Sequence, residues 1–280
     1  MKNKKSSFST FLLILMLIFG VALLLYPTVS DYWNSKTQSK AVARYEETIQ
    51  EIDEDQFKEM WNAAKAYNKK LQEIPVGLGL PEEMKEQYYK TLAVSDSGII
   101  GTVEIPAISV SLPIYHGTSE DVLQVAVGHI DWTSLPTGGI GTHCAISGHR
   151  GLPSAKLFTN VDQLKEGDIF MLRVLDEILT YEVDRILIVE PNVLEPLGIE
   201  EGKDLCTLVT CTPYGVNTHR LLIRGHRIEN VEEAKTVRII SDAIRIEPFL
   251  VAPVVAVPIM ILFVTILLIP KKKKDEYDEE

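Results

Sequence analysis

The sequence has few cysteines and no excess of positive charge, and both shortages limit what the protein can be. Its 280 residues carry a net charge of −11, and no basic patch with interleaved aromatics is present, so we expect no nucleic acid partner. Its six histidines include no i, i+4 pair, and its three cysteines form no CxxC motif. These are the usual spacings of metal ligands, so we expect neither a metal site nor a cofactor.

Two long apolar runs lie near the ends of the chain. Residues 8–26 follow three lysines among the first five positions and fit either a secretory signal or an uncleaved membrane anchor. Residues 249–269 carry no charge and precede four lysines, which predicts a transmembrane helix. If the first run is not cleaved, the positive-inside rule places both termini in the cytoplasm and residues 31–248 outside the membrane.

The folded part between the runs changes character near residue 98. Between residues 40 and 72, apolar positions recur at three- and four-residue steps, which predicts one or two amphipathic helices. Residues 74–81 are rich in Pro and Gly and predict a loop. From Gly98 onward, short β-branched runs alternate with turn residues at a spacing of about ten, which is typical of a closed or nearly closed β-barrel.

Cys211 stands where a predicted strand meets a loop. The run "DLCTLVTC" is apolar on both faces, as a central strand would be, and Pro213 stops further pairing. Residues 212–219 would form the loop, and Arg220 would open the next strand. If the two strands are neighbours, Arg220 lies at the same end of the sheet as Cys211, where its charge would favour a thiolate. The alternatives at this stage are a buried inert thiol and an arginine in a structural ion pair.

The histidines compete for the role of general base beside such a thiol. His149 in "HCAISGHRGLP" emerges where a strand-like run reaches a Gly-rich turn. His129, in a turn bounded by glycine, is its rival. A nucleophilic cysteine needs a proton-transfer partner and donors for developing negative charge, so Cys211, His149 and Arg220 are the residues we expect to carry the chemistry.

The motifs "SGHRGLP", "TLVTC" and "NTHRLLIRGHR" together resemble the signature blocks of sortases, and in particular of the pilus-assembling class C type. The similarity extends over residues 98–228. It implies an eight-stranded sortase barrel in which Cys211 is the nucleophile, His149 the acid/base and Arg220 the group that stabilises the carbonyl or oxyanion. It also implies cleavage of an LPxTG-like sorting signal between Thr and Gly, a thioacyl intermediate on Cys211, and transfer to a lysine amine of a pilin subunit.

The expected organisation is mainly β, with N-terminal helices and terminal transmembrane segments. Its parts are a signal or membrane anchor (1–30), a helical region that could carry a lid (31–90), a catalytic barrel (91–230), a linker (231–248), a transmembrane helix (249–269) and a cytoplasmic tail (270–280). The partners implied are surface or pilin proteins of a Gram-positive-type cell. Two other functions stay open: a sortase that attaches proteins to peptidoglycan, and a catalytically silent surface-binding barrel.

Two details depart from, or add to, the family pattern. Pilus sortases often carry an Asp-Pro-aromatic lid before the barrel, but residues 71–90 contain no Asp-Pro pair. The lid is therefore either absent or built from other residues, such as 74–80. In addition, Cys144 precedes His149 by five residues, and Cys206 precedes Cys211 by five. If the two strands are parallel neighbours, as in sortases, Cys144 and Cys206 should touch, as a disulfide or as packed thiols; two unrelated buried thiols are the alternative.

Overall fold

A computed structural model of the chain describes residues 4–230. The linker, transmembrane helix and tail expected over 231–248, 249–269 and 270–280 lie outside these described residues.

Three helices precede the barrel: α1 (Lys4–Gln50), α2 (Glu54–Leu71) and α3 (Glu82–Lys90). The first apolar run and the start of the amphipathic region belong to one continuous helix, α1. The residues of this helix up to Val29 belong to one compact unit, and those from Ser30 onward belong to another. Large apolar side chains are exposed along its first part, and α1 is long and apolar enough to cross a membrane. An anchor at this end of the chain is therefore consistent with the structure.

The amphipathic pattern over 40–72 proves to be two helices because Asp53 caps the second one. Its carboxylate accepts hydrogen bonds from the backbone N–H groups of Asp55 (3.0 Å) and Gln56 (2.8 Å). The Gln56 side chain in turn accepts from the N–H of Asp53 at 3.4 Å. This reciprocal capping box starts α2 and separates it from α1.

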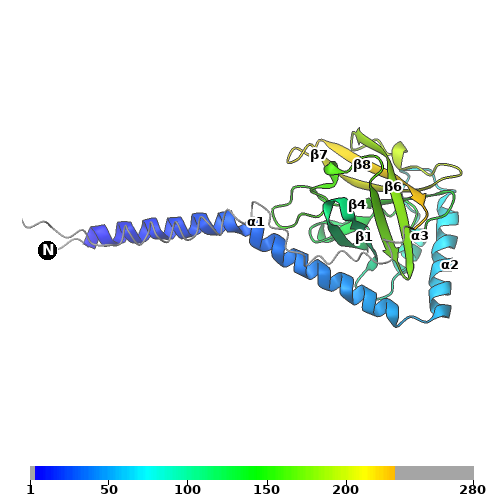
Figure 1. Ribbon diagram of the computed structural model, residues 1–280, viewed down its shortest axis with the longest axis horizontal. Coiled ribbons are helices and arrows are strands. Elements are labelled where there is room, and N and C mark those ends of the chain that lie inside the picture. The colour runs from blue at the N-terminus through cyan, green and yellow to red at the C-terminus, as the bar shows by residue number, and fades with distance from the viewer. Residues whose placement is uncertain (1–3, 231–280) are drawn as a thin grey trace, which may run out of the picture. The chain divides into compact units, whose positions relative to one another are not determined.

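Eight strands form a closed barrel in the order β1-β2-β3-β4-β7-β8-β6-β5 (Figure 1). The strands are β1 (Ile99–Ile105), β2 (Val110–His116), β3 (Val127–His129), β4 (Thr142–Ser147), β5 (Ile169–Val174), β6 (Glu177–Val189), β7 (Asp204–Thr212) and β8 (His219–Ile228). Short helical turns lie between them: η1 (Pro106–Ile108), α4 (Glu120–Leu123), η2 (Val161–Gln163) and η3 (Glu195–Leu197). The expectation of a mainly β, eight-stranded barrel with N-terminal helices is confirmed.

The pairing of β4 with β7 sets the geometry of one end of the barrel. The two strands are parallel, and each residue of β7 lies 62 positions after its partner in β4, from Thr142 and Asp204 to Ser147 and Val209. Both are almost entirely buried, as expected for central strands with apolar residues on both faces. Strand β8 runs antiparallel to β7 on its other side.

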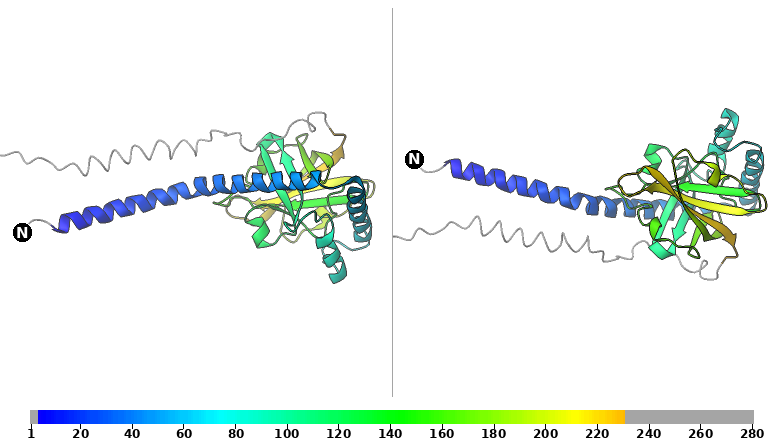
Figure 2. Two further views of the ribbon diagram at one scale, coloured as in Figure 1. Left: turned by 90° about the horizontal axis from the view of Figure 1, so that it is seen from below. Right: turned by 90° about the horizontal axis from the view of Figure 1, so that it is seen from above.

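The core fills the barrel and extends under α2 and α3, which lie against the barrel in the views of Figures 1 and 2. Tyr67 of α2 and Tyr88 of α3 are fully buried. Asn68 fixes α2 to the barrel, because its amide donates to the carbonyl of Leu135 and to Thr137 Oγ1, both at 2.9 Å, and its carbonyl accepts from the N–H of Leu135 at 2.7 Å. A buried amide with three such bonds favours one position of the helix.

Candidate active site

Cys211 and Arg220 are direct partners across β7 and β8. The antiparallel register pairs them at the loop end of the hairpin, as predicted for neighbouring strands. The loop between the strands is shorter than predicted: Thr212 and His219 still pair, so only residues 213–218 lie outside the strands. The expected loop of 212–219 was therefore too long by one residue at each end. Cys211 is partly exposed, which suits a thiol that must meet a substrate.

The Arg220 guanidinium is held by backbone carbonyls. Its Nη1 donates to the carbonyl of His219 at 3.2 Å and to that of Asn217 at 3.4 Å. Across residues 4–230 no carboxylate forms a salt bridge with it at the 4.0 Å limit that defines one. The structural ion pair considered for Arg220 is thus not observed in the described part of the chain. Its remaining donors can serve a carbonyl oxygen or oxyanion.

His149 follows the end of β4, beside the end of β7. The N–H of Gly148 donates to the carbonyl of Val209 at 3.0 Å, which continues the ladder one residue beyond Ser147. The same offset of 62 positions then places His149 alongside Cys211. The carbonyl of His149 accepts from the N–H of Phe158 at 3.1 Å, and its Nε2 lies 3.8 Å from Glu120 Oε1 of α4. Its side chain is 28% exposed, so the ring is open to a substrate at this end of the barrel.

Two contacts around Gly148 explain the sequence of this turn. A side chain at Gly148 could not be accommodated, because its Cβ would lie 2.7 Å from Phe158 Cδ2 and 2.8 Å from Val127 Cγ1. The Gly148 carbonyl accepts from Thr210 Oγ1 at 2.7 Å. The residue before the histidine is thus bonded to the residue before the cysteine. Sequence reasoning did not single out Thr210, although its position beside Cys211 was a signal.

The rival histidine, His129, cannot reach a substrate. It lies in strand β3 and is 0% exposed, rather than in an exposed turn. Its Nδ1 lies 2.9 Å from the Tyr88 hydroxyl, and its Nε2 lies 2.8 Å from the Ser134 carbonyl. Because a carbonyl only accepts, Nε2 is the donor in this contact. His129 is therefore a hydrogen-bonded core residue that joins α3 to the barrel.

Cys144 and Cys206 lie side by side below the site, as predicted from their equal offsets. They are register partners in β4 and β7, both are buried, and both are free thiols. Burial opposes ionisation of Cys144, but contacts with Cys206 and His129 outweigh it and lower the pKa of Cys144 overall. Burial and the Cys144 neighbour raise the pKa of Cys206 well above its usual value. The pair is thus a set of packed thiols that share a hydrogen bond.

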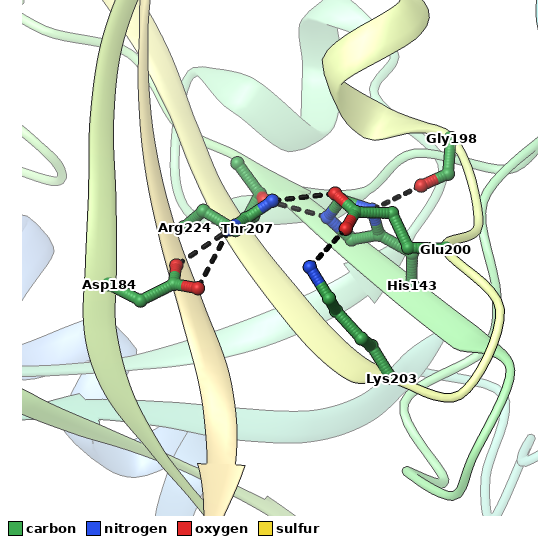
Figure 3. Close-up of polar contacts among 7 residues, drawn as sticks. All are labelled: His143, Asp184, Gly198, Glu200, Lys203, Thr207 and Arg224. Atoms are coloured by element: carbon green, nitrogen blue, oxygen red, sulfur yellow. Dashed lines mark hydrogen bonds and ion pairs between the residues drawn. The ribbon is translucent and has the colours of Figure 1, made fainter.

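A polar network surrounds Arg224 of β8 (Figure 3). Its Nε and Nη2 donate to the two carboxylate oxygens of Asp184 at 2.9 and 2.7 Å, and its Nη1 donates to Glu200 Oε1 at 2.6 Å. Lys203 also pairs with Glu200. Burial would raise the pKa of Asp184, but the hydrogen bonds and charge of Arg224 lower it overall. The network ties the connection between β6 and β7 to β6 through Asp184 and to β8 through Arg224.

His143 lies beside this network in Figure 3. Its Nδ1 lies 2.7 Å from the carbonyl of Gly198, and its Nε2 lies 2.7 Å from Thr207 Oγ1. Burial lowers the pKa of His143, which keeps the ring neutral, so Nδ1 donates to the carbonyl and Nε2 accepts from the hydroxyl. His143 is therefore structural, and it holds the same connection between β6 and β7.

The segment 74–80 lies against the connection between β6 and β7. A side chain on Gly77 would meet Leu194 Cδ1 at 2.9 Å, and Val76 Cγ2 lies 3.3 Å from the position of a Cβ on Gly198. Leu78 is 74% exposed. Val76 and Gly77 thus pack against residues 194–198 of this connection.

No group of three or more His, Cys, Asp and Glu side chains suited to a metal occurs within residues 4–230. The chemistry that this end of the barrel supports is that of a partly exposed thiol with an imidazole and a guanidinium beside it.

The chain belongs to the sortase family, whose members are cysteine transpeptidases. The family model described as "Sortase domain" matches residues 103–228. Among solved structures, sortase C1 of Streptococcus agalactiae is 47% identical, with a TM-score of 0.67 over 69% of this chain and 100% of that one. Sortase C of Streptococcus pneumoniae is 44% identical, with a TM-score of 0.62 over 68% of this chain and 97% of that one. The structural neighbours are thus class C sortases.

Curated relatives agree on the family. Sortase D of Bacillus subtilis is 30% identical over 131 residues, which cover 46% of this chain and 63% of the relative. Sortase A of Bacillus anthracis is 24% identical over 224 residues, covering 80% of this chain and 95% of the relative. The chain therefore spans a little under two thirds of the sortase D and nearly the whole of this sortase A.

Proposed function

We propose that this chain is a membrane-anchored transpeptidase that cleaves an LPxTG-like sorting signal and transfers the acyl group to a lysine amine of a pilin subunit. The observation that carries the proposal is the register of β4, β7 and β8, which pairs Cys211 with Arg220 and puts His149 alongside. The proposed residues come from three separate segments that end at the same end of the barrel. In this arrangement Cys211 serves as nucleophile, His149 as general acid and base, and Arg220 as carbonyl or oxyanion stabiliser.

The reaction proceeds in two balanced steps. The Cys211 thiolate attacks the threonine carbonyl carbon, the C–S bond forms, and the C–N bond to glycine breaks as His149 gives a proton to the leaving amine. The lysine amine then attacks the thioester carbonyl, an isopeptide C–N bond forms, and the C–S bond breaks. The lysine proton passes to His149, and Cys211 leaves as thiolate. Arg220 donates to the carbonyl oxygen on which negative charge develops in both steps.

The choice of pilin as acceptor rests on the solved neighbours. The Streptococcus pneumoniae sortase C structure is described as giving insights into pilin substrate specificity, and a further neighbour is described as sortase C1 of a pilus island, 39% identical with a TM-score of 0.62. The helical region before the barrel in this chain also packs into the core through Tyr67 and Tyr88. Attachment of proteins to peptidoglycan is the competing function, and the identity of the amine acceptor separates the two.

The orientation is also part of the proposal. Lysines at positions 2, 4 and 5 precede the apolar part of α1, so the positive-inside rule puts the N-terminus in the cytoplasm and the barrel outside. Sorting signals and pilin amines would then meet the enzyme on the outer side of the membrane.

The test uses the full chain in detergent micelles with an LPxTG-like peptide and a lysine-bearing acceptor peptide. Intact mass should show an acyl adduct on the wild type, and tandem mass spectrometry should place it on Cys211. Cys211→Ala should abolish both adduct and transfer, whereas Cys206→Ala, a thiol removed from the same strand, should retain them. His149→Ala should slow transfer by about a hundredfold or more. Arg220→Lys should also slow it, because a point charge cannot replace a planar fork.

Three results would count against the proposal. A wild type that forms no adduct on Cys211 would support the silent binding barrel instead. Full activity of Arg220→Ala would remove Arg220 from the site. Transfer to a peptidoglycan amine in preference to the lysine acceptor would favour the anchoring function.

A further inference from the structure

Arg150, the residue after His149, has a nearly buried side chain that reaches the strand carrying the cysteine. Its side chain is only 10% exposed. The guanidinium Nε donates to the carbonyl of Thr159 at 3.3 Å, and Nη2 pairs with the carboxylate of Asp162. Nη1 donates to Thr212 Oγ1 at 3.4 Å. Thr159 and Asp162 belong to the segment between β4 and β5, whereas Thr212 directly follows Cys211 in β7.

The same guanidinium also contacts the loop between β7 and β8. Its Cζ lies 5.8 Å from the centre of the Tyr214 ring, within the range of a cation–π contact. The Tyr214 ring covers Gly151 as well: a Cβ on Gly151 would lie 3.1 Å from Tyr214 Cε2, and Gly151 has a φ of +79°, which favours glycine. Arg150 thus joins three segments: the turn that carries His149, the end of β7 and the loop after it.

The direction of the Thr212 side chain shows that Arg150 contacts β7 on the face opposite to the Cys211 side chain. Successive side chains of a strand point to opposite faces, so Cys211 and Thr212 face opposite sides of the sheet. Cys211 is partly exposed, but Thr212 is 8% exposed. A guanidinium that bonds Thr212 and is itself nearly buried has no free face for a substrate. Its contact with β7 is instead one residue away from the nucleophile, just as its own position is one residue away from the proposed base.

We propose that Arg150 is a positioning residue that fixes the distance between His149 and Cys211. This inference rests on the proposed function, because it matters only if the two residues exchange a proton. The planar guanidinium can bond the carbonyl of Thr159, the Asp162 carboxylate and the Thr212 hydroxyl at once. A lysine ammonium, which is a point charge, cannot reproduce this fixed arrangement of donors. Misplacement of a reacting pair by about 1 Å can cost about a hundredfold in rate, so the removal of such a clamp should be visible in kcat.

Arg227 provides a matched control at a distance. It has the same kinds of contact: its Nε lies 3.9 Å from Asp204 Oδ2, and its Cζ lies 5.7 Å from the Tyr181 ring centre. It stands seven positions after Arg220 in β8, which is about 23 Å along a strand. Arg227→Met therefore removes an equivalent arginine without touching the site.

The test compares Arg150→Met, Arg150→Lys and Arg227→Met in the full chain in detergent. The measurements are kcat and KM for peptide transfer, the pH profile of adduct formation on Cys211, and the thermal midpoint. Arg150→Met should lower kcat by about tenfold to a hundredfold with little change in KM, and should shift the pH profile. Arg150→Lys can still pair with Asp162 and should recover the thermal midpoint but not kcat. Arg227→Met should change the thermal midpoint while kcat and the pH profile stay those of the wild type.

Two outcomes would overturn the positioning role: a kcat loss in Arg150→Met no larger than in Arg227→Met, or full recovery of kcat in Arg150→Lys. If Arg150→Met does not fold, Arg150→Lys decides alone, because a wild-type kcat and pH profile in that variant contradicts the inference. Failure of the proposed function is a separate result, since it appears as transfer that survives Cys211→Ala in the unaltered Arg150 background.

Discussion

Lowering the pH from about 7.5 to about 4.5 should destabilise the barrel through His116, at the end of β2. Its side chain is only 7% exposed. Its Nε2 lies 2.8 Å from the carbonyl of Thr91, so the ring donates there and binds α3 to the barrel. The rings of Tyr88 and Tyr89 pack against it, with centroids 4.9 and 5.8 Å away. Burial is the main cause that lowers its pKa from 6.5 to about 4, and nearby His129 adds to the effect.

Whether stability rises or falls with pH depends on which state, folded or unfolded, binds the proton at the higher pH. As the pH falls below 6.5, the unfolded chain protonates this histidine, whereas the folded chain resists until about pH 4. The unfolded state therefore binds more protons in that window, and stability falls as the pH falls. Since one pKa unit corresponds to about 1.4 kcal/mol, the loss reaches about 2.5 kcal/mol at pH 4.5. This is a large share of the stability of a typical domain, about 5–15 kcal/mol.

The assay is urea unfolding of the detergent-solubilised chain, followed by tryptophan fluorescence at both pH values. His116→Gln removes the titrating ring but keeps an N–H donor for the Thr91 carbonyl. His143, whose pKa is also lowered by burial, titrates in both proteins and cancels in the comparison. The wild type should lose about 2.5 kcal/mol more than His116→Gln between the two pH values. Parallel pH dependences of the two proteins would refute the buried, neutral state of His116.

Three further outcomes test other parts of the structure. Arg224→Met should lower the free energy of unfolding by about 2 kcal/mol, because it leaves Asp184 without its partner and leaves Glu200 with Lys203 alone; a denaturation midpoint equal to that of the wild type would contradict this. Asn68→Leu should cost about 2 kcal/mol by leaving the N–H of Leu135 unsatisfied, while the Leu135 carbonyl still accepts from the N–H of Thr137; amide exchange at Leu135 should accelerate. Alkylation after denaturation without reductant should label all three thiols per chain; a mass two hydrogens lower with one label would show a disulfide instead.

The register of β4 against β7 could be predicted once the resemblance to sortases implied that the two strands are parallel neighbours. Equal spacings of five residues, from Cys144 to His149 and from Cys206 to Cys211, predicted that the two cysteines touch if the strands are parallel neighbours. The pairing of Cys144 with Cys206 confirms it. A register shift of one residue would have separated Cys144 from Cys206 and His149 from Cys211, since side chains alternate between faces with a period of two.

Side-chain partners that are distant in the chain were not accessible in the same way. Arg150 bonds Thr212 across 62 positions, and Arg224 bonds Asp184 across 40, with no local pattern that marks either pair. The exposure of His129 was also misjudged, because a glycine beside it suggested a turn where the chain forms a short buried strand. Gly128 is needed there for another reason: its Cβ would lie 2.1 Å from the Gly117 carbonyl oxygen. A turn and a close approach of two backbones both require glycine, so a glycine in the sequence does not distinguish between them.

The positions of the three cysteines prevent Cys211, the proposed nucleophile, from forming a disulfide within its own chain. A disulfide requires Cα atoms within about 7 Å. Cys206 and Cys211 are five residues apart in one strand, about 17 Å, and Cys144 is beside Cys206 rather than Cys211. In an oxidising compartment the two buried thiols can therefore pair only with each other. The thiol at the open end of the barrel has no such neighbour and stays available to a substrate.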